Sequence, residues 1–238
     1  MSRLRNTGVM VIQIYWETNA ENFDMRGTGL TRRSVSFMVP FLSLPTFLLP
    51  SAGFAGGVPT PETTEGPYYP QVMSKDDNGD LVKIEGSDRE ADGEILHLTG
   101  RVLDLAGQPL AGARVEIWQC DNNAVYHHTY DRSYSLRDTA FQGFGYVMAD
   151  QTGGFAFRTI VPVPYPGRTP HVHVKVHHND RARLTTQLYL KGHRQNVSDF
   201  IFHILTFAQR RQVEMKLTSV VAGERKAFRT AIDLVVPS

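Results

Sequence analysis

Apolar and polar residues alternate along several short stretches of this chain, the pattern of β-strands with one buried face. The stretch HVHVKVHH shows it most clearly. Successive side chains of a strand point to opposite faces, so Val172, Val174 and Val176 share one face and His171 and His173 share the other. We expect the valines to be buried. The two imidazoles therefore point together, either into solvent or into a site.

The same alternation recurs on both sides of turn-rich segments. Runs at 95–104 and 113–119 flank AGQPLAG in the manner of a hairpin, two more flank residues 150–154, and HVHVKVHH is followed by LTTQLYLKG. Short strands separated by Gly and Pro turns predict an all-β fold, a two-sheet antiparallel β-sandwich with a loop-rich N-terminal region. The one helix candidate is TFAQRRQVEMK at 206–216.

The fold is expected to occupy residues 58–238, because 1–57 have the order of an export signal with an upstream extension, disordered or removed. Arg32 and Arg33 precede an apolar stretch that ends in small residues at Ala55. Three prolines interrupt that stretch, so no stable membrane span is expected. The arginine pair resembles a twin-arginine signal, which implies export to the periplasm; the alternative is a cytoplasmic protein.

Composition narrows the class of protein. A hydrophobic share of 41% is enough for a sizeable core, and a net charge of +1 gives no electrostatic footprint for nucleic acid. The one cysteine, Cys120, excludes an internal disulfide and a cysteine-based zinc site. We expect it to be a small buried residue beside Trp118.

Three separated motifs carry a family resemblance: TPETTEGPYYP at 60–70, IWQCDNNAVYHHTYD at 117–131 and VPVPYPGRTPHVHV at 161–174. Together they resemble the intradiol ring-cleavage dioxygenases of the protocatechuate 3,4-dioxygenase type, over residues 58 to about 190. The segment GRVLDLAGQPLAGARVEIW alone is also similar to non-catalytic transthyretin-like sandwiches. A solvated binding module of that kind is therefore an alternative.

The resemblance implies a ferric ion, Fe(3+), held by Tyr126, Tyr165, His171 and His173. Phenolate is a hard anionic oxygen donor, and imidazole suits iron. A free tyrosine has a pKa of about 10, so only a bound cation would keep these phenols ionised near neutral pH. A metalloprotein that uses the same ligands for Zn or Cu is the other alternative.

The resemblance also implies catalytic roles for Tyr126, Arg168 and Gln187. The Arg168 guanidinium would stabilise negative charge developing on the substrate ring, and Gln187 would lie beside the metal. The implied reaction takes a catechol-type aromatic and O2 to a cis,cis-muconate-type diacid without an organic cofactor. Oligomeric state is left open. Four further histidines match no ligand and are expected at the surface or around the site: His127, His128, His177 and His178.

Between Tyr165 and His171 the chain has five residues, and Gly167 stands where protocatechuate enzymes tend to have a tryptophan. The segment is shorter than in the well-known branches of the family. Both departures predict a more open mouth to the site.

Overall fold

The computed structural model describes residues 57–71, 78–222 and 225–237. The predicted export signal lies outside the described residues, apart from Gly57 at its end. Within these ranges no helix is long and apolar enough to cross a membrane.

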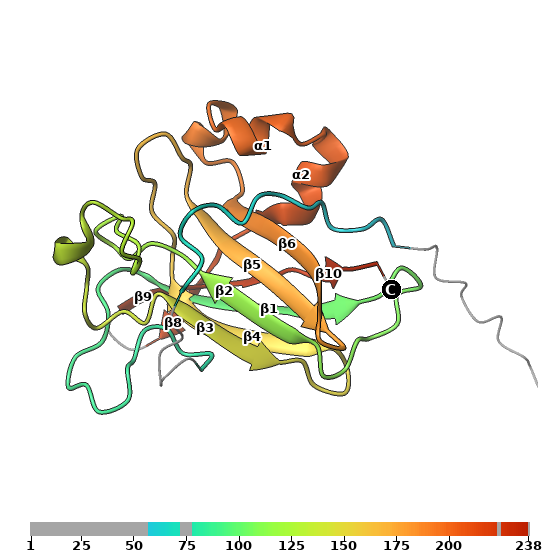
Figure 1. Ribbon diagram of the computed structural model, residues 1–238, viewed down its shortest axis with the longest axis horizontal. Coiled ribbons are helices and arrows are strands. Elements are labelled where there is room, and N and C mark those ends of the chain that lie inside the picture. The colour runs from blue at the N-terminus through green and yellow to red at the C-terminus, as the bar shows by residue number, and fades with distance from the viewer. Residues whose placement is uncertain (1–56, 72–77, 223–224, 238) are drawn as a thin grey trace, which may run out of the picture. The chain divides into compact units, whose positions relative to one another are not determined.

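The described chain forms strands, with few and short helices (Figure 1). The strands are β1 (Ile95–Leu103), β2 (Arg114–Trp118), β3 (Phe144–Met148), β4 (Gly154–Ile160), β5 (His171–His178), β6 (Arg181–Leu190), β7 (Glu214–Met215), β8 (Thr218–Ala222), β9 (Arg225–Ala231) and β10 (Leu234–Val235). The helices are η1 (Tyr134–Leu136), η2 (Arg194–Val197), α1 (Phe200–Ile204) and α2 (Phe207–Val213).

Two five-stranded sheets share one core, which confirms the predicted all-β sandwich. One sheet has the order β10-β1-β9-β8, with β4 also paired to β1, and the other has the order β3-β2-β5-β6-β7. The valines of β5 are buried with Leu96 and Leu98 of β1 in one apolar cluster. The alternation read from HVHVKVHH therefore assigned the core face of β5 correctly.

The sheets are mixed rather than purely antiparallel. Strand β1 runs parallel to β9 and β10, and β6 runs parallel to β7. The C-terminal strands come back from the helical segment to join strands formed much earlier in the chain. Such returns can place strands side by side in the same direction.

Two of the expected hairpins are wrong. Strand β1 pairs with β4, β9 and β10, whereas β2 pairs with β3 and β5, so the turn between β1 and β2 connects the two sheets. The turn between β3 and β4 does the same. Only β5 and β6 form the expected antiparallel pair, through a tight turn in which Asn179 and Asp180 have φ of 52° and 57°.

The predicted helix at 206–216 is present in part as α2, and Thr206 and Gln209 cap its start reciprocally. It ends at Val213, and the next two residues form β7 instead. Helix α1 was not predicted. The Asp199 carboxylate begins it by accepting hydrogen bonds from the backbone N–H groups of Ile201 and Phe202. This cap matters for the site, because the second oxygen of Asp199 faces Arg168.

Candidate metal centre

Three of the four predicted donor atoms converge in the interior. His171 and His173 project from β5, and Tyr126 comes from the loop between β2 and β3; each side chain is about 2% exposed. The Nε2 of His171 lies 3.2 Å from the Nε2 of His173 and 3.4 Å from the Tyr126 hydroxyl oxygen. The histidine face of β5 therefore points into a buried site and not into solvent.

The fourth predicted donor, Tyr165, lies at the edge of this group and is half-buried. The Tyr165 ring centroid is 5.5 Å from that of Tyr126 and 5.6 Å from that of His171. All four predicted side chains are thus neighbours.

Hydrogen bonding defines the tautomer of His171. Its Nδ1 is 2.7 Å from the carbonyl oxygen of Thr169, and because a carbonyl only accepts, Nδ1 carries the proton. Burial lowers the pKa of His171 to about 4, so the ring is neutral near pH 7. Its Nε2 then presents a free lone pair to the centre, as a metal ligand must.

The same burial acts on the other donors. Burial, and then the neighbouring His171, holds the pKa of His173 well below its usual value. Burial raises the pKa of Tyr126 well above 10, reinforced by the neighbouring Tyr165, and burial also raises the pKa of Tyr165. The histidines are thus neutral and the phenols protonated until a cation displaces their protons.

The spacing of the donors fits a metal ion. Two donors that each lie about 2 Å from a shared ion can be at most about 4 Å apart, and the donors of Tyr126 and His173 each lie within that limit of Nε2 of His171. Nowhere in the described ranges do three or more His, Cys, Asp or Glu side chains gather to hold an ion. A metal here therefore needs the tyrosines as ligands.

Aromatic packing holds two of these rings in place. The Trp118 indole is stacked on His173 with ring centroids 4.6 Å apart, and Tyr68 is stacked on Tyr126 at 4.5 Å. Gly66 has φ of +73°, and a Cβ there would lie 3.5 Å from Cε1 of His173. Cys120 is buried beside Trp118, as predicted.

Arg168 reaches the centre from the segment before β5. Its Nη1 donates to the Tyr165 hydroxyl at 3.3 Å, and its Nη2 donates to Oε1 of Gln187. Its Nε donates to Oδ2 of Asp199 at 2.9 Å. The structure thus joins the two predicted residues, Arg168 and Gln187, into one hydrogen-bonded unit beside Tyr165.

Asp199 is the site residue that sequence reasoning missed. Burial alone would raise its pKa, but hydrogen bonds from the backbone of Phe202 and Thr169, together with Arg168, lower it overall. The carboxylate is therefore ionised and fixes the guanidinium. An aspartate directly before the apolar run FIFHI is a helix-cap signal that could have placed it at the start of α1.

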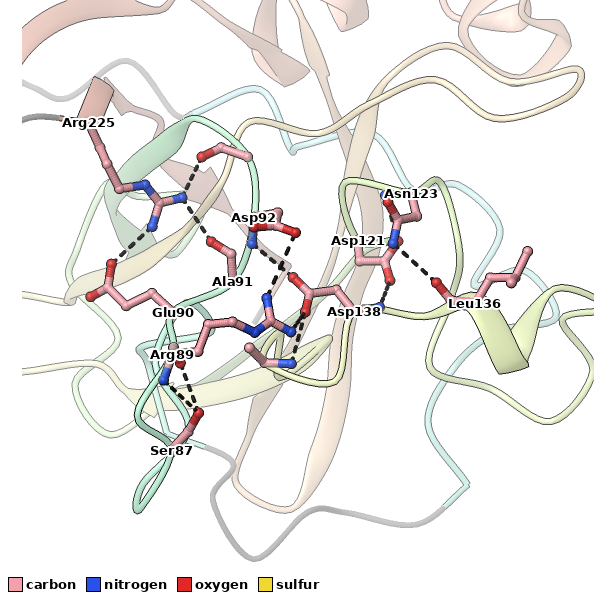
Figure 2. A network of polar contacts seen from close by, with 12 residues as sticks. Ser87, Arg89, Glu90, Ala91, Asp92, Asp121, Asn123, Leu136, Asp138 and Arg225 are labelled. Carbon is pink, nitrogen blue, oxygen red and sulfur yellow. Dashed lines mark hydrogen bonds and ion pairs between the residues drawn. The ribbon is translucent and has the colours of Figure 1, made fainter.

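A polar network fixes the loop that carries Tyr126. Asp131 accepts a hydrogen bond from the Tyr126 N–H at 2.8 Å, and Asp121 accepts one from Val125 at 3.0 Å. Figure 2 shows that Asp121 also accepts from the backbone N–H of Asp138, whose carboxylate binds Arg89 and the N–H of Asp92. The loop position is thus set by the buried carboxylates of Asp121 and Asp138 and by the half-buried one of Asp131.

The four remaining histidines take different places. His127 lies 3.6 Å from Asp121, and His128 is buried with its ring edge-on to Tyr68. Both belong to the loop that carries Tyr126. His177 and His178 are half-buried at the far end of β5, where His177 is 3.4 Å from Glu116.

Replacing Asp138 with alanine should lower the free energy of unfolding by about 1–3 kcal/mol, because the buried N–H group of Ala140 and the partly buried one of Asp92 lose their acceptor. Chemical denaturation measures this. The matched control is Asp92→Ala, which removes only an exposed ion pair of 3.8 Å to Arg89 and should change stability by less than about 1 kcal/mol. Equal effects of the two variants would contradict this account of the network.

Comparison with known proteins identifies the family of the chain. The dioxygenase family model matches residues 64–237. The chain is 32% identical over 164 residues to a catechol 1,2-dioxygenase of Pseudomonas sp. (strain EST1001), covering 60% of this chain and 51% of that protein. It is 31% identical over 191 residues to a protocatechuate 3,4-dioxygenase beta chain of Burkholderia cepacia, covering 75% of this chain and 81% of that protein.

Among solved structures, the dioxygenase domain of a carbohydrate-binding fusion protein from Streptomyces sp. SirexAA-E is similar, with a TM-score of 0.57 and 31% identity. The match covers 75% of this chain and 97% of that one.

The chain therefore belongs to the intradiol dioxygenase family, whose members are ring-cleaving oxygenases. It spans about half the length of the catechol 1,2-dioxygenase named above. It spans 81% of the protocatechuate 3,4-dioxygenase beta chain.

Proposed function

We propose that this protein is a non-haem Fe(3+) intradiol dioxygenase that cleaves a catechol-type ring with O2 to a cis,cis-muconate-type diacid. The observation that carries the proposal is that the donor atoms of Tyr126 and His173 lie 3.4 Å and 3.2 Å from Nε2 of His171, with the Tyr165 ring packed beside Tyr126 and His171. These four residues would hold the ion. Two phenolates largely neutralise a ferric charge, which favours the oxidised state.

The bound ferric ion would supply Lewis acidity, drawing electron density from a chelated catecholate so that a ring carbon reacts with O2. The protein must accept the protons that the catechol loses. Tyr126 is fully buried, and Asp131 fixes its backbone. Tyr165 is half-buried beside Arg168, so its oxygen, as the phenolate that a bound cation would leave, would be the better placed of the two to take up one substrate proton.

Arg168 supplies the positive charge. Its guanidinium is oriented by Asp199, Gln187 and Tyr165 before any substrate arrives, so it stabilises negative charge on the ring without rearranging. Gln187 acts through Arg168 by holding one of its nitrogens. A second hydrogen bond, from Nε2 of Gln187 to the Thr64 carbonyl at 2.9 Å, fixes the amide in turn.

The substrate side of the site is open at Gly167. This residue has φ of +80°, and a Cβ there would meet no atom within 4 Å. The two relatives described above are named for catechol and for protocatechuate, so both are candidate substrates. A ring with a substituent would have room on the Gly167 side.

The test is turnover of catechol and protocatechuate by the iron-loaded protein under labelled dioxygen. We expect one O2 consumed per ring and both labelled oxygen atoms in a muconate-type diacid, detected by mass spectrometry. Zinc-loaded protein is the control and should be inactive. Absence of oxygen uptake on either substrate would favour a binding module, and an aldehyde product of cleavage beside the diol would contradict the intradiol assignment.

A further inference from the structure

A cavity of about 280 Å³ lies beside Tyr126. Its walls come from β2, from residues 68–70 and from the loop that leads into β3. Tyr126 belongs both to this cavity and to the candidate metal centre. The other site residues do not line it: Tyr165, Arg168, His171, His173 and Gln187. The cavity therefore meets the candidate metal centre at Tyr126 and not at Arg168.

Three residues of this cavity carry a buried polar atom without a hydrogen-bond partner in the described part of the chain. Nε2 of His127 is one of them and lies 3.6 Å from a carboxylate oxygen of Asp121. The other two are Nε1 of Trp118 and Oε1 of Gln142, both on buried side chains with no charged partner. An indole N–H only donates, and an amide oxygen only accepts. Leaving such groups unpaired is unfavourable, so they favour a ligand group that accepts and donates at once. A hydroxyl group does both.

Arg137 adds a positive charge to the wall. Its Nη1 donates to the carbonyl of Tyr134 at 3.0 Å, and its guanidinium packs 4.0 Å above the Tyr134 ring. No carboxylate of the described residues lies within 4.0 Å of it. Its other N–H groups can therefore bind a carboxylate in the planar, two-pronged manner of arginine.

Apolar side chains complete the cavity: Tyr68, Ile84, Phe141 and Phe144. Such walls favour a flat ring over a chain of waters. We propose that this cavity binds a small aromatic carboxylate with a ring hydroxyl, the hydroxyl between Trp118 and Gln142 and the carboxylate at Arg137. Such a ligand needs no second, adjacent hydroxyl, in contrast to the catechols that we propose for the metal centre.

Occupancy of this cavity would reach the centre through two rings. Trp118 is stacked on His173, and Tyr126 itself forms part of the wall. A bound ligand would therefore restrict both side chains, and it is a candidate regulator of the metal site. The binding argument itself uses none of the proposed metal chemistry.

The test is calorimetric titration of 4-hydroxybenzoate into the iron-loaded full chain, with and without saturating catechol under argon. We expect one binding event that survives catechol, and at least a tenfold weaker affinity in Arg137→Ala. Arg132→Ala is the matched control, because Arg132 is exposed on the same loop and does not line the cavity; it should bind as the parent does. Benzoate, which lacks the hydroxyl, should bind about tenfold more weakly.

Three results would overturn this proposal. The first is the absence of heat with 4-hydroxybenzoate, which would leave a cavity filled with water only. The second is full competition by catechol. The third is an affinity that Arg137→Ala does not change. Gln142→Leu serves as a second variant, with its thermal midpoint checked because Gln142 also donates to the Phe144 carbonyl. If catechol does not bind the centre at all, the function proposed above fails while the Arg137 comparison still tests the cavity.

Discussion

Replacing His173 with alanine is expected to reduce iron affinity by more than about 100-fold and to abolish ring cleavage. Disturbing a residue that only supports a ligand typically costs 10–100-fold, so loss of a ligand should exceed that range. The His173 imidazole is buried and neutral, and its Nε2 lies 3.2 Å from Nε2 of His171. Because the site is closed to bulk solvent, a water molecule is a poor substitute for this ligand. Metal analysis after dialysis and oxygen uptake measure the two effects.

The matched control is His178→Ala. His178 ends the same strand but is half-buried away from the centre, so this variant should retain iron and activity. Thermal unfolding followed by circular dichroism separates a lost ligand from a lost fold, because His173 also packs on Trp118. A folded His173→Ala protein that holds iron as the parent does would contradict the proposed ligand set.

The second large effect is expected for Arg168→Lys, a change that keeps the charge. Lysine is a point charge and cannot contact Tyr165, Gln187 and Asp199 at once, as the guanidinium does. We expect kcat to fall by about 10²–10³-fold, the range seen when one oriented donor to a developing charge is removed. Iron content should not change, because Arg168 donates no ligand atom.

The control is Arg181→Lys, an exposed position at the start of β6 that should leave kcat unchanged. Asp199 keeps backbone hydrogen bonds from Thr169, Ile201 and Phe202, so the buried carboxylate remains satisfied in the Arg168→Lys protein. A rise in KM with an unchanged kcat would show that Arg168 only binds substrate, and would contradict its proposed role in stabilising charge.

Strand positions and the histidine face were predictable because a period of two is a local property. The valines of β5 are buried because each alternate side chain of one strand faces the core. Pairing is not local. The alternation in β1 and β2 is the same whether the strands lie in one sheet or in two, so the turn between them was taken for a hairpin, whereas it crosses between sheets.

In the site, too, local features were predictable from the sequence and contacts between distant segments were not. Two histidines on one strand face could be placed together from spacing, but Tyr126 and Tyr165 were assigned only through the family motifs. Asp199, which orients Arg168, lies 31 residues further along the chain and comes close only when α1 folds against the segment before β5. The cavity beside Tyr126 depends on residues 68–70, on Ile84, on β2 and on the loop that leads into β3, so no local pattern predicts it.

The visible absorption spectrum of the purified, iron-loaded protein tests the central claim most directly. Tyrosinate bound to ferric iron absorbs visible light by ligand-to-metal charge transfer, whereas iron held by histidines alone does not produce that band. The account predicts a coloured protein whose band shrinks in Tyr126→Phe and in Tyr165→Phe. A protein that contains one iron per chain and stays colourless would contradict it.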